Sequence, residues 1–569
     1  MKYLKFVQYL GELESISSRL AITDTLSKLI KEMDDDEVEK GIYLVLGQLG
    51  PDFDKVDFGM AVKMVIRAVA EGSGRNVSEV EKMYKKKGDL GELAREIRFD
   101  ETKIKSYSVV EIFDHLMEIA KDSGQGSQER KVISLRSLLC SISAEERKYL
   151  VRIVLGRLRL GFSEKTIFDA LSKIESGGKE KRKELDTVYQ IYPNPGIIAA
   201  VVKSKGFGGL KNIKVKTGVP VVPALCQRLN SSEEIVSKMK DVAVERKYDG
   251  TRVQIHFDRS KNVVRTYTRN LEETSWMFPE LKNMGDWVNG KSVILDCEAV
   301  GIDKKTGKVL SFQITITRKR KHDVAETAES VPLRFFLFDI LSKDGEDLIN
   351  KPYFERRKIL SETIKKNEVI VPDEYVRANK ALDVKELHEK YLKEGFEGAV
   401  VKMWNGEYLP GRQGWNWVKI KEAEGTTGKL SDTMDLVVLG YYYGRGKRAA
   451  FGIGAFLVGL EKEGKWVSLA KIGTGLTDKE FKQLKKELDD HVVMERPKNY
   501  SVEGTLTADV WVEPSVVVEV AADEITKSPT HAAGVALRFP RLVKFRDDKS
   551  PAQATTWKEV ETIAKLSKV

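Results

Sequence analysis

The hydrophobic period of the chain changes near residue 215, and this change constrains the fold more than any other feature. From residue 1 to about residue 210, apolar residues recur at spacings of three and four, which is typical of amphipathic helices. After the stretch KSKGFGGLKNIKVKTG the period becomes two, as in Val253, Ile255 and Phe257, which is typical of strands. The sequence therefore predicts an all-helical part followed by parts that contain sheets.

The length and these patterns together predict three domains. A chain of 569 residues is too long for one hydrophobic core. We expect an all-helical domain over residues 1–215 and an α+β domain over 216–422, in which helices such as VKELHEKYLKEG separate the strands. Over residues 423–569, many glycines and short strands predict a small β-barrel with one helix from Asp478 to about His491.

One helix of the first part has clear end signals. Ser143 and Glu146 form a capping box, apolar residues follow at three- and four-residue spacings, and Gly161 follows the expected end. The same segment carries five cations, which fit either a phosphate-binding surface or an ordinary solvated helix face. These cations are Arg147, Lys148, Arg152, Arg157 and Arg159.

The composition restricts the compartment and the partners. The formal net charge is +10, which fits a polyanionic partner. It also fits a solvated surface rich in ion pairs, as in proteins of thermophiles. The three cysteines include no C-x-x-C pair, so neither a disulfide framework nor a cysteine-rich zinc site is indicated, and a reducing cytoplasm fits best. No segment approaches the ~18 apolar residues of a membrane span, so we expect neither export nor a membrane.

The octapeptide ERKYDGTR, from Glu245 to Arg252, places Lys247 in a K-x-D-G turn. Gly250 permits a backbone geometry that a side chain would obstruct. A lysine that attacks as a nucleophile must be neutral, although its ordinary pKa is near ~10.4. One such match is weak evidence, because a surface lysine in a turn is the ordinary interpretation.

Five further motifs follow in order: Arg269 in TYTRN, then LDCEAV, FFLFDIL, EGFEGAVVK and WVKIK. With them the chain resembles, over nearly its whole length, the ATP-dependent DNA ligases of the covalent nucleotidyltransferase superfamily, above all the archaeal replicative type. The resemblance implies a helical DNA-binding domain over 1–215 and a nucleotidyltransferase (adenylation) domain over 216–422. It also implies an OB-fold over 423–569 that ends in RFPRLVKFRDDKS.

The resemblance implies a role for each matching residue. Lys247 would attack the α-phosphorus of ATP, while Glu245 and Phe338 would contact adenine. Glu298 and Glu397 would hold the metal, Mg²⁺ or else Mn²⁺, and Glu298 also reaches the ribose. The other implied nucleotide-binding residues are Arg252, Arg269, Lys402, Arg412, Lys419 and Lys421, and those of the OB-fold that would assist adenylation are Arg538, Arg541 and Lys549.

Three local questions follow from these motifs. Glu397 and Lys402 lie five residues apart, so an unbroken strand would point them to opposite faces, and a bend at Gly398 would resolve this. Cys297 stands where the family usually has glycine, and we interpret it as a packing residue. Arg252 and Arg269 would favour the neutral form of Lys247 by like-charge repulsion.

The implied reaction is the sealing of nicked duplex DNA through a lysyl adenylate and a DNA adenylate, in replication, repair and recombination. The enzyme would be a monomer whose barrel closes over ATP about a hinge near residues 421–426. A sliding clamp is a further expected partner, through IKSYSVVEIF, Ile104–Phe113, although this segment matches the usual clamp motif poorly.

Four alternatives remain. RNA ligases and messenger-RNA capping guanylyltransferases share the K-x-D-G core, but the long helical domain argues against both. An NAD-dependent DNA ligase would carry a four-cysteine zinc module, which is missing here. A catalytically dead DNA-binding scaffold is opposed by the presence of Lys247, Glu298, Glu397, Lys419 and Lys421.

Overall fold

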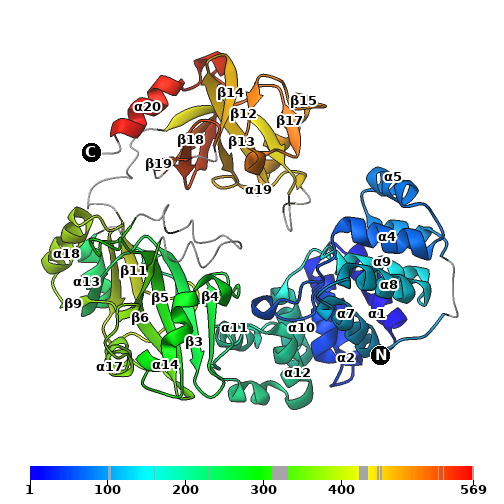
Figure 1. Cartoon of the computed structure of the whole chain (residues 1–569), viewed down its shortest axis with the longest axis horizontal. Coiled ribbons are helices and arrows are strands. Elements are labelled where there is room, and N and C mark those ends of the chain that lie inside the picture. Colours follow the sequence, from blue (N-terminus) through cyan, green and yellow to red (C-terminus); the bar gives the residue numbers. More distant parts are fainter. Residues whose placement is uncertain are drawn as a thin grey trace. The chain divides into compact units, whose positions relative to one another are not determined.

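The computed structural model of the chain divides into two compact units, Met1–Lys421 and Glu422–Val569 (Figure 1). It describes residues 1–99, 104–158, 160–229, 231–310, 315, 331–421, 433–444, 448, 451–522, 524–528 and 531–566. Within these ranges, no helix is both long enough and apolar enough to cross a bilayer.

The N-terminal region of the first unit is helical, as predicted. Among the described residues up to 213, the regular elements are helices, and their apolar faces share one hydrophobic core. These helices are α1 (Tyr3–Ser15), α2 (Arg19–Glu32), α3 (Val38–Val45), η1 (Asp52–Asp54), α4 (Val62–Gly72), α5 (Val77–Lys87), α6 (Leu90–Glu96), α7 (Val109–Lys121), α8 (Ser127–Cys140), α9 (Ala144–Val154), α10 (Glu164–Ser176), α11 (Arg182–Ile191), α12 (Pro195–Lys205) and η2 (Phe207–Asn212).

Helix α9 departs from its prediction in two ways. The capping box of Ser143 and Glu146 is present, but the helix ends at Val154, because the chain turns at Gly156 with a φ of 62° rather than at Gly161. Three of its cations are buried, so for them both the phosphate-binding and the solvated-face interpretations are wrong. Arg147, Lys148 and Arg152 are all at most 7% exposed, Arg157 is exposed, and Arg159 lies outside the described residues.

Two of the buried cations of α9, Lys148 and Arg152, pair with acids of α1 and of α6 and its N-cap. Lys148 Nζ lies 2.8 Å from Glu14 and 2.7 Å from Glu92. Arg152 donates to Glu14 and Asp89, each at 2.9 Å. This helix therefore uses its positive charge inside the protein, where it joins three helices that are distant in sequence.

The central region of the first unit contains two sheets. One has the strand order β1-β11-β10-β2-β9 and the other β4-β3-β5-β6-β7, with β8 parallel to β6. The strands are β1 (Gln227–Arg228), β2 (Val242–Arg246), β3 (Thr251–Asp258), β4 (Val263–Thr268), β5 (Ser292–Gly301), β6 (Leu333–Lys343), β7 (Glu346–Asp347), β8 (Ile370–Pro372), β9 (Tyr375–Ala378), β10 (Ala399–Met403) and β11 (Trp417–Ile420).

Helices cover both central sheets. Residues of α13 (Ser232–Met239) and α18 (Ala381–Lys393) share a core with the first sheet. Residues of α14 (Met284–Trp287) and α17 (Tyr353–Thr363) share a core with the second, together with the short helices η3 (Ser275–Met277) and η4 (Pro279–Asn283). Cys297 lies in this second core and is fully buried, as expected of a packing residue.

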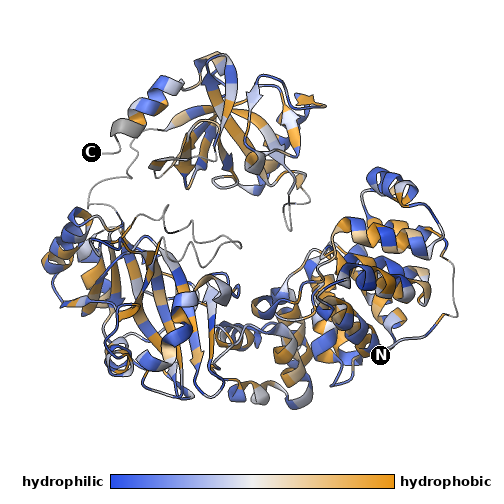
Figure 2. Cartoon of the chain, viewed as in Figure 1, coloured by the Kyte–Doolittle hydropathy of each residue, from blue (hydrophilic) through white to orange (hydrophobic). Residues whose placement is uncertain are grey.

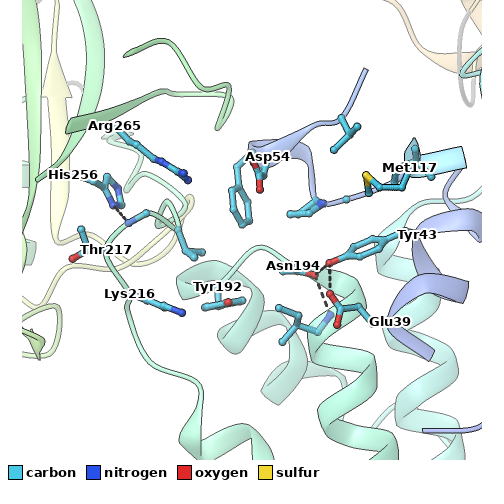
Figure 3. A pocket seen from close by; sticks show the side chains of 18 of the residues that line it. Glu39, Tyr43, Asp54, Met117, Tyr192, Asn194, Lys216, Thr217, His256 and Arg265 are labelled. Atoms are coloured by element: carbon cyan, nitrogen blue, oxygen red, sulfur yellow. Dashed lines mark hydrogen bonds between the residues drawn. The ribbon is translucent and has the colours of Figure 1, made fainter. Parts of the chain in front are cut away.

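Polar side chains of β3 form hydrogen bonds with the segment that connects the helical region to the central region. The backbone N–H of Gly218 donates to His256 Nδ1 at 3.0 Å, and Gln254 exchanges two hydrogen bonds with the backbone of Val221 at 2.8 and 3.0 Å. Both side chains are buried, at 1% and 2% exposed. His256 also lines a hollow of about 770 Å³, together with Tyr43 and Asn194 of the helical region. Figure 3 shows these three side chains.

The second unit is β-rich, as predicted. Its main sheet has the order β15-β17-β12-β13-β14-β16, with β18 joined to β12 and β21 to β18, and a second pair is β19-β20. Its strands are largely hydrophobic in Figure 2. The elements are β12 (Met434–Tyr442), β13 (Ala455–Lys462), β14 (Lys465–Ile472), α19 (Asp478–Asp489), β15 (Val492–Val493), β16 (Tyr500–Ser501), η7 (Gly504–Leu506), β17 (Val510–Val512), β18 (Val517–Ala521), β19 (Glu524–Lys527), β20 (Val535–Arg538), β21 (Arg541–Phe545), η8 (Pro551–Gln553) and α20 (Trp557–Leu566). The expected hinge near residues 421–426 lies outside the described residues, except for Lys421.

Candidate active site

A pocket of about 420 Å³ lies between the two central sheets. This volume is within the usual range for small-molecule sites. Strands β2, β10 and β11 of the first sheet line one side, and β3, β5 and β6 of the second line the other. Its lining includes nine of the residues singled out from the sequence: Glu245, Lys247, Arg252, Arg269, Glu298, Phe338, Lys402, Arg412 and Lys419.

Lys247 is held at the pocket by its backbone. Its N–H donates to the carbonyl of Gly398 at 3.0 Å, and its own carbonyl accepts from the N–H of Glu397 at 3.0 Å. At Gly250 a Cβ atom would lie 2.5 Å from the carbonyl oxygen of Ala299, so only glycine fits where the turn enters β3. The expected need for glycine in the K-x-D-G turn is therefore confirmed.

The amine of Lys247 has an anionic partner. It forms an ion pair with Oε2 of Glu397, while Lys421 pairs with Oε1 of the same carboxylate. Burial raises the pKa of Glu397, but the two ammonium groups outweigh it and hold this pKa below its usual range. An ammonium has no lone pair with which to attack phosphorus, so Lys247 must lose a proton before any attack.

Gly398 provides the bend expected between Glu397 and Lys402. Its φ is 136°, and a Cβ atom there would lie 2.1 Å from the carbonyl oxygen of Ile420. Strand β10 begins only at Ala399, after this glycine. As a result Glu397 contacts Lys247, while the ammonium of Lys402 reaches Glu245 at 2.7 Å.

The floor of the pocket is a buried carboxylate with two donors. Glu245, which is 2% exposed, accepts from Lys402 on Oε2 and from the hydroxyl of Tyr353 on Oε1. The ammonium of Lys402 also donates to the carbonyl of Phe338 at 3.0 Å and lies 4.3 Å from the ring centre of Trp417. Lys402 is only 1% exposed, so its charge is enclosed by protein groups.

Arg252 forms part of the wall opposite. Its guanidinium makes a bidentate pair with the fully buried Asp296, at 3.0 and 2.6 Å, and the hydroxyl of Tyr408 donates to the same carboxylate at 2.8 Å. The guanidinium lies 5.3 Å from the ring centre of Phe338. Because Asp296 neutralises it, Arg252 does not act on Lys247 as the isolated like charge that we expected.

Burial changes the protonation of two further pocket residues. It raises the pKa of Glu298 to about 7, and the charges of Asp296 and Glu397 also raise it, against the opposing effect of Lys247 and Arg252. Burial lowers the pKa of Lys419, and neighbouring cations lower it further, beginning with Lys421. Arg269 and Arg412 are exposed at the rim.

Two residues at or behind the base of the pocket were not predicted from the sequence. Asp373 lines it and accepts from the hydroxyl of Tyr248 at 2.9 Å, and burial together with the charge of Glu245 raises its pKa to about 7. Tyr353 opens α17 and reaches Glu245 from behind. Neither residue stands in a motif or in a periodic pattern, so no sequence signal marks them.

The three residues singled out near the C-terminus belong to the second unit. Arg538 ends β20, with its guanidinium 5.6 Å from the ring centre of Phe539, and Arg541 begins β21. The ammonium of Lys549 lies 2.6 Å from Asp435, which Arg546 also contacts at 2.9 Å. Inside this unit, Lys549 and Arg546 therefore share one acid.

Among the described residues, no group of three or more histidine, cysteine or acidic side chains could by itself hold a metal ion. Glu298 and Glu397 both feel the charge of Lys247, and the charge of Glu397 also acts on Glu298. Two such oxygen donors, completed by phosphate and water, are the kind of site that Mg²⁺ takes.

Three family models match the chain. The model described as ATP dependent DNA ligase domain matches residues 223–421, and the one described as DNA ligase N terminus matches residues 2–172. The model described as ATP dependent DNA ligase C terminal region matches residues 449–549. All the residues that line the pocket between the two sheets fall within the first match.

Relatives that match over nearly the whole chain are named DNA ligases. The chain is 41% identical to a probable DNA ligase of Dictyoglomus turgidum, over 98% of this chain and 97% of that one. It is 38% identical to a DNA ligase of Pyrobaculum islandicum over 100% and 99%, and 34% identical to one of Saccharolobus solfataricus over 98% and 96%. A solved structure named Pmar-Lig_PreS3 is 17% identical over 95% of this chain and 99% of that one, with a TM-score of 0.54, which indicates a shared fold alone.

Proposed function

We propose, because this chain belongs to the family of ATP-dependent DNA ligases and is of the archaeal type, that Lys247 is the residue that receives AMP. The enzyme seals nicks in duplex DNA: it is adenylated by ATP, it passes AMP to the 5′-phosphate of the nick, and the 3′-hydroxyl then displaces AMP. The observation that carries the assignment is the position of Lys247 in a nucleotide-sized pocket, paired with the carboxylate of Glu397.

In the first step the Nζ lone pair of Lys247 forms a bond to the α-phosphorus, and the bond to pyrophosphate breaks. The proton that Lys247 must lose first has Glu397 as its nearest acceptor, since the two side chains are already paired. Lys419 and Lys421 stand beside them, and we assign these cations to the phosphates and to the adenylate.

The base and ribose contacts follow from the two sides of the pocket. We assign Glu245 and Phe338 to adenine and Glu298 to the ribose, and count Arg252 among the nucleotide contacts. The enclosed ammonium of Lys402 supports a place for this residue beside Glu245 at the base of the pocket. The exposed Arg269 and Arg412 are assigned to the polar parts of the nucleotide at the rim.

The family normally needs a divalent metal besides ATP, and we propose Mg²⁺, with Mn²⁺ as a substitute. Glu298 and Glu397 would hold it, because both are carboxylates beside Lys247. When bound, such an ion neutralises charge on the phosphate oxygens as the leaving group departs. Glu298 has to be ionised to bind the ion, which a pKa of about 7 allows near neutral pH.

We propose the domain limits 1–215, 216–422 and 423–569, for an all-α DNA-binding domain, the adenylation domain and an OB-fold. Within the OB-fold, Arg538, Arg541 and Lys549 would assist adenylation, with movement about residues 421–426. This proposal rests on the resemblance of the C-terminal motif and on the β-rich second unit.

Nicked DNA is the substrate, and the other partners are proposals. We propose a cytoplasmic monomer that acts in replication, repair and recombination. A sliding clamp would bind at Ile104–Phe113, of which Ile104 is 50% exposed and Phe113 is buried at the start of α7. If a Tyr107→Ala variant bound the clamp with unchanged affinity, this segment would not be the clamp-binding site.

The test uses α-labelled ATP, GTP or NAD and follows the label first on the protein and then on nicked DNA. We expect label from ATP on the wild-type chain, its transfer to the nick, and no label on the Lys247→Ala variant. Ligation that survives in Lys247→Ala would overturn the assignment of the nucleophile. Label from NAD instead of ATP would overturn the cofactor.

A further inference from the structure

The carboxylate of Glu245 is held from behind by a tyrosine that no motif contains. Tyr353 is fully buried, and its hydroxyl donates to Oε1 of Glu245, while Lys402 occupies Oε2 at 2.7 Å. Burial, followed by the charge of Glu245, raises the pKa of Tyr353 well above its ordinary value, so this hydroxyl keeps its proton and acts as a donor. Each carboxylate oxygen therefore has one fixed donor.

The tyrosine itself cannot easily move. It is the first residue of α17, and its N–H donates to the carbonyl of Gly406 at 2.9 Å. One turn onward Arg356 is fully buried and makes a bidentate pair with the equally buried Asp339, at 2.7 and 3.0 Å. The ring of Tyr353 is also met edge-on by Trp404, with 6.2 Å between ring centres.

A carboxylate has about four acceptor positions and, when ionised, no donor. Two positions on Glu245 are filled by Tyr353 and Lys402, which leaves the carboxylate to present its remaining acceptors to the pocket that it lines. Adenine carries an amino group at position 6, which donates, whereas guanine carries an oxygen there, which only accepts. A fixed acceptor on Glu245 therefore binds the amino group of adenine. It repels the oxygen of guanine, because both atoms carry partial negative charge.

We propose that Tyr353 is a positioning residue that sets the nucleotide specificity of this ligase, by orienting Glu245 as a rigid acceptor for the amino group of adenine. This inference rests on the proposed function, in which Glu245 contacts the base. It adds a residue of α17, outside the nucleotide-binding motifs, to the determinants of the choice between ATP and GTP.

The test compares Tyr353→Phe with the wild type in the formation of the labelled protein, using α-labelled ATP and GTP. Loss of one hydrogen bond to a buried carboxylate is expected to reduce the preference for ATP over GTP about tenfold, mainly by raising KM for ATP. The rate at which an already adenylated enzyme passes AMP to nicked DNA is expected to stay unchanged, because AMP is then covalently placed.

A matched control removes the same kind of hydrogen bond elsewhere. Tyr149 is 1% exposed, and its hydroxyl donates to Glu14 at 2.6 Å in the helical region. Tyr149→Phe should lower the melting temperature to a similar degree as Tyr353→Phe while leaving the ATP to GTP ratio at the wild-type value. Both variants are assayed well below their melting temperatures.

A double-mutant comparison tests whether Tyr353 acts through Glu245. In a Glu245→Ala background, Tyr353→Phe should change neither KM nor the nucleotide ratio any further. A wild-type ratio in the single variant, or an equal loss in both backgrounds, would overturn the inference. Failure of the proposed function looks different, since the wild type would then take no label from ATP or would still be labelled in Lys247→Ala.

Discussion

Gly398 lies between two charged groups of the site, the ion pairs of Glu397 and the strand that carries Lys402. On one side of it Glu397 pairs with Lys247 and Lys421, and on the other the strand that carries Lys402 begins. Its φ of 136° belongs to a region that side chains rarely adopt, and the carbonyl of Ile420 fills the place of a Cβ atom. Both the backbone angle and the close approach therefore demand glycine.

We expect Gly398→Ala to lower the free energy of unfolding by about 1–3 kcal/mol from backbone strain alone, and by more from the close contact. It should also slow labelling by ATP, because Glu397 is displaced from Lys247. Urea unfolding and the rate of label uptake measure the two effects.

The control for this variant is Gly395→Ala, whose φ is 91° with open space around the new methyl group. That variant carries strain without the contact. Labelling that slows equally in both variants would show that the backbone approach at Gly398 is unimportant.

Residues in motifs of fixed spacing could be expected to lie together, and one pocket does gather Glu245, Lys247 and Glu298. The protonation states of these residues could not be predicted from the sequence. The pairing of Lys247 with Glu397 depends on where a bend places a carboxylate, and the residues behind Glu245 come from a helix more than a hundred positions later. Sequence spacing carries no information about such contacts.

At the scale of elements, α9 shows how a basic helix becomes part of a core. Removing one member of a buried ion cluster leaves the other charges uncompensated, which typically costs about 3–5 kcal/mol. Arg152 is 5% exposed and contacts Glu14 and Asp89. We therefore expect Arg152→Met to reduce the free energy of unfolding by about this amount, measured by urea titration.

Lys82→Met is the matched control, because Lys82 is exposed on α5 and surface substitutions usually change stability by less than ~0.5 kcal/mol. If Arg152→Met were as stable as the wild type but bound nicked DNA more weakly, Arg152 would be a phosphate contact after all. The periodicity of α9 was readable from the sequence, but the acids that pair with its cations lie on α1 and α6, about 60 to 140 positions away.

The hydrogen bond between the N–H of Gly218 and the buried His256 of β3 predicts that stability depends on pH. Burial, followed by the charge of Arg265, lowers the pKa of His256 to about 3, whereas the unfolded chain has the ordinary value near 6.5. Between these values the unfolded chain binds a proton that the folded chain does not. The contribution of neutral His256 to stability is therefore fully present above about pH 6.5 and is lost as the pH decreases toward 3.

The slope of this effect is about 1.4 kcal/mol per pH unit, so His256 should account for a loss of about 2 kcal/mol between pH 6.5 and pH 5. Because carboxylates titrate as well, the measurement is the difference between the wild type and His256→Gln in urea unfolding across this range. His115→Gln, at an exposed histidine, should retain the wild-type slope. An unchanged slope in His256→Gln would refute the role of the buried imidazole.

At the scale of the whole molecule, the two units divide the proposed reaction between them. All the residues that line the pocket between the two central sheets belong to Met1–Lys421, whereas Arg538, Arg541 and Lys549 belong to Glu422–Val569. Lys549 is paired with Asp435 inside its own unit, so any contact with ATP requires it to leave that acid or to share it. Arg546 would then still neutralise Asp435.

This division predicts that a fragment of residues 1–421 folds and binds ATP but labels itself slowly. Loss of preorganised cations around a transferring phosphoryl group typically slows a reaction about 100-fold or more. Calorimetry should give a Kd for ATP close to that of the full chain, while the rate of label uptake falls by about this factor. Lys549→Ala in the full chain is the companion variant, expected to melt near the wild-type temperature because Arg546 remains on Asp435. A fragment that takes up label as fast as the full chain would remove the second unit from the adenylation step and restrict it to later ones.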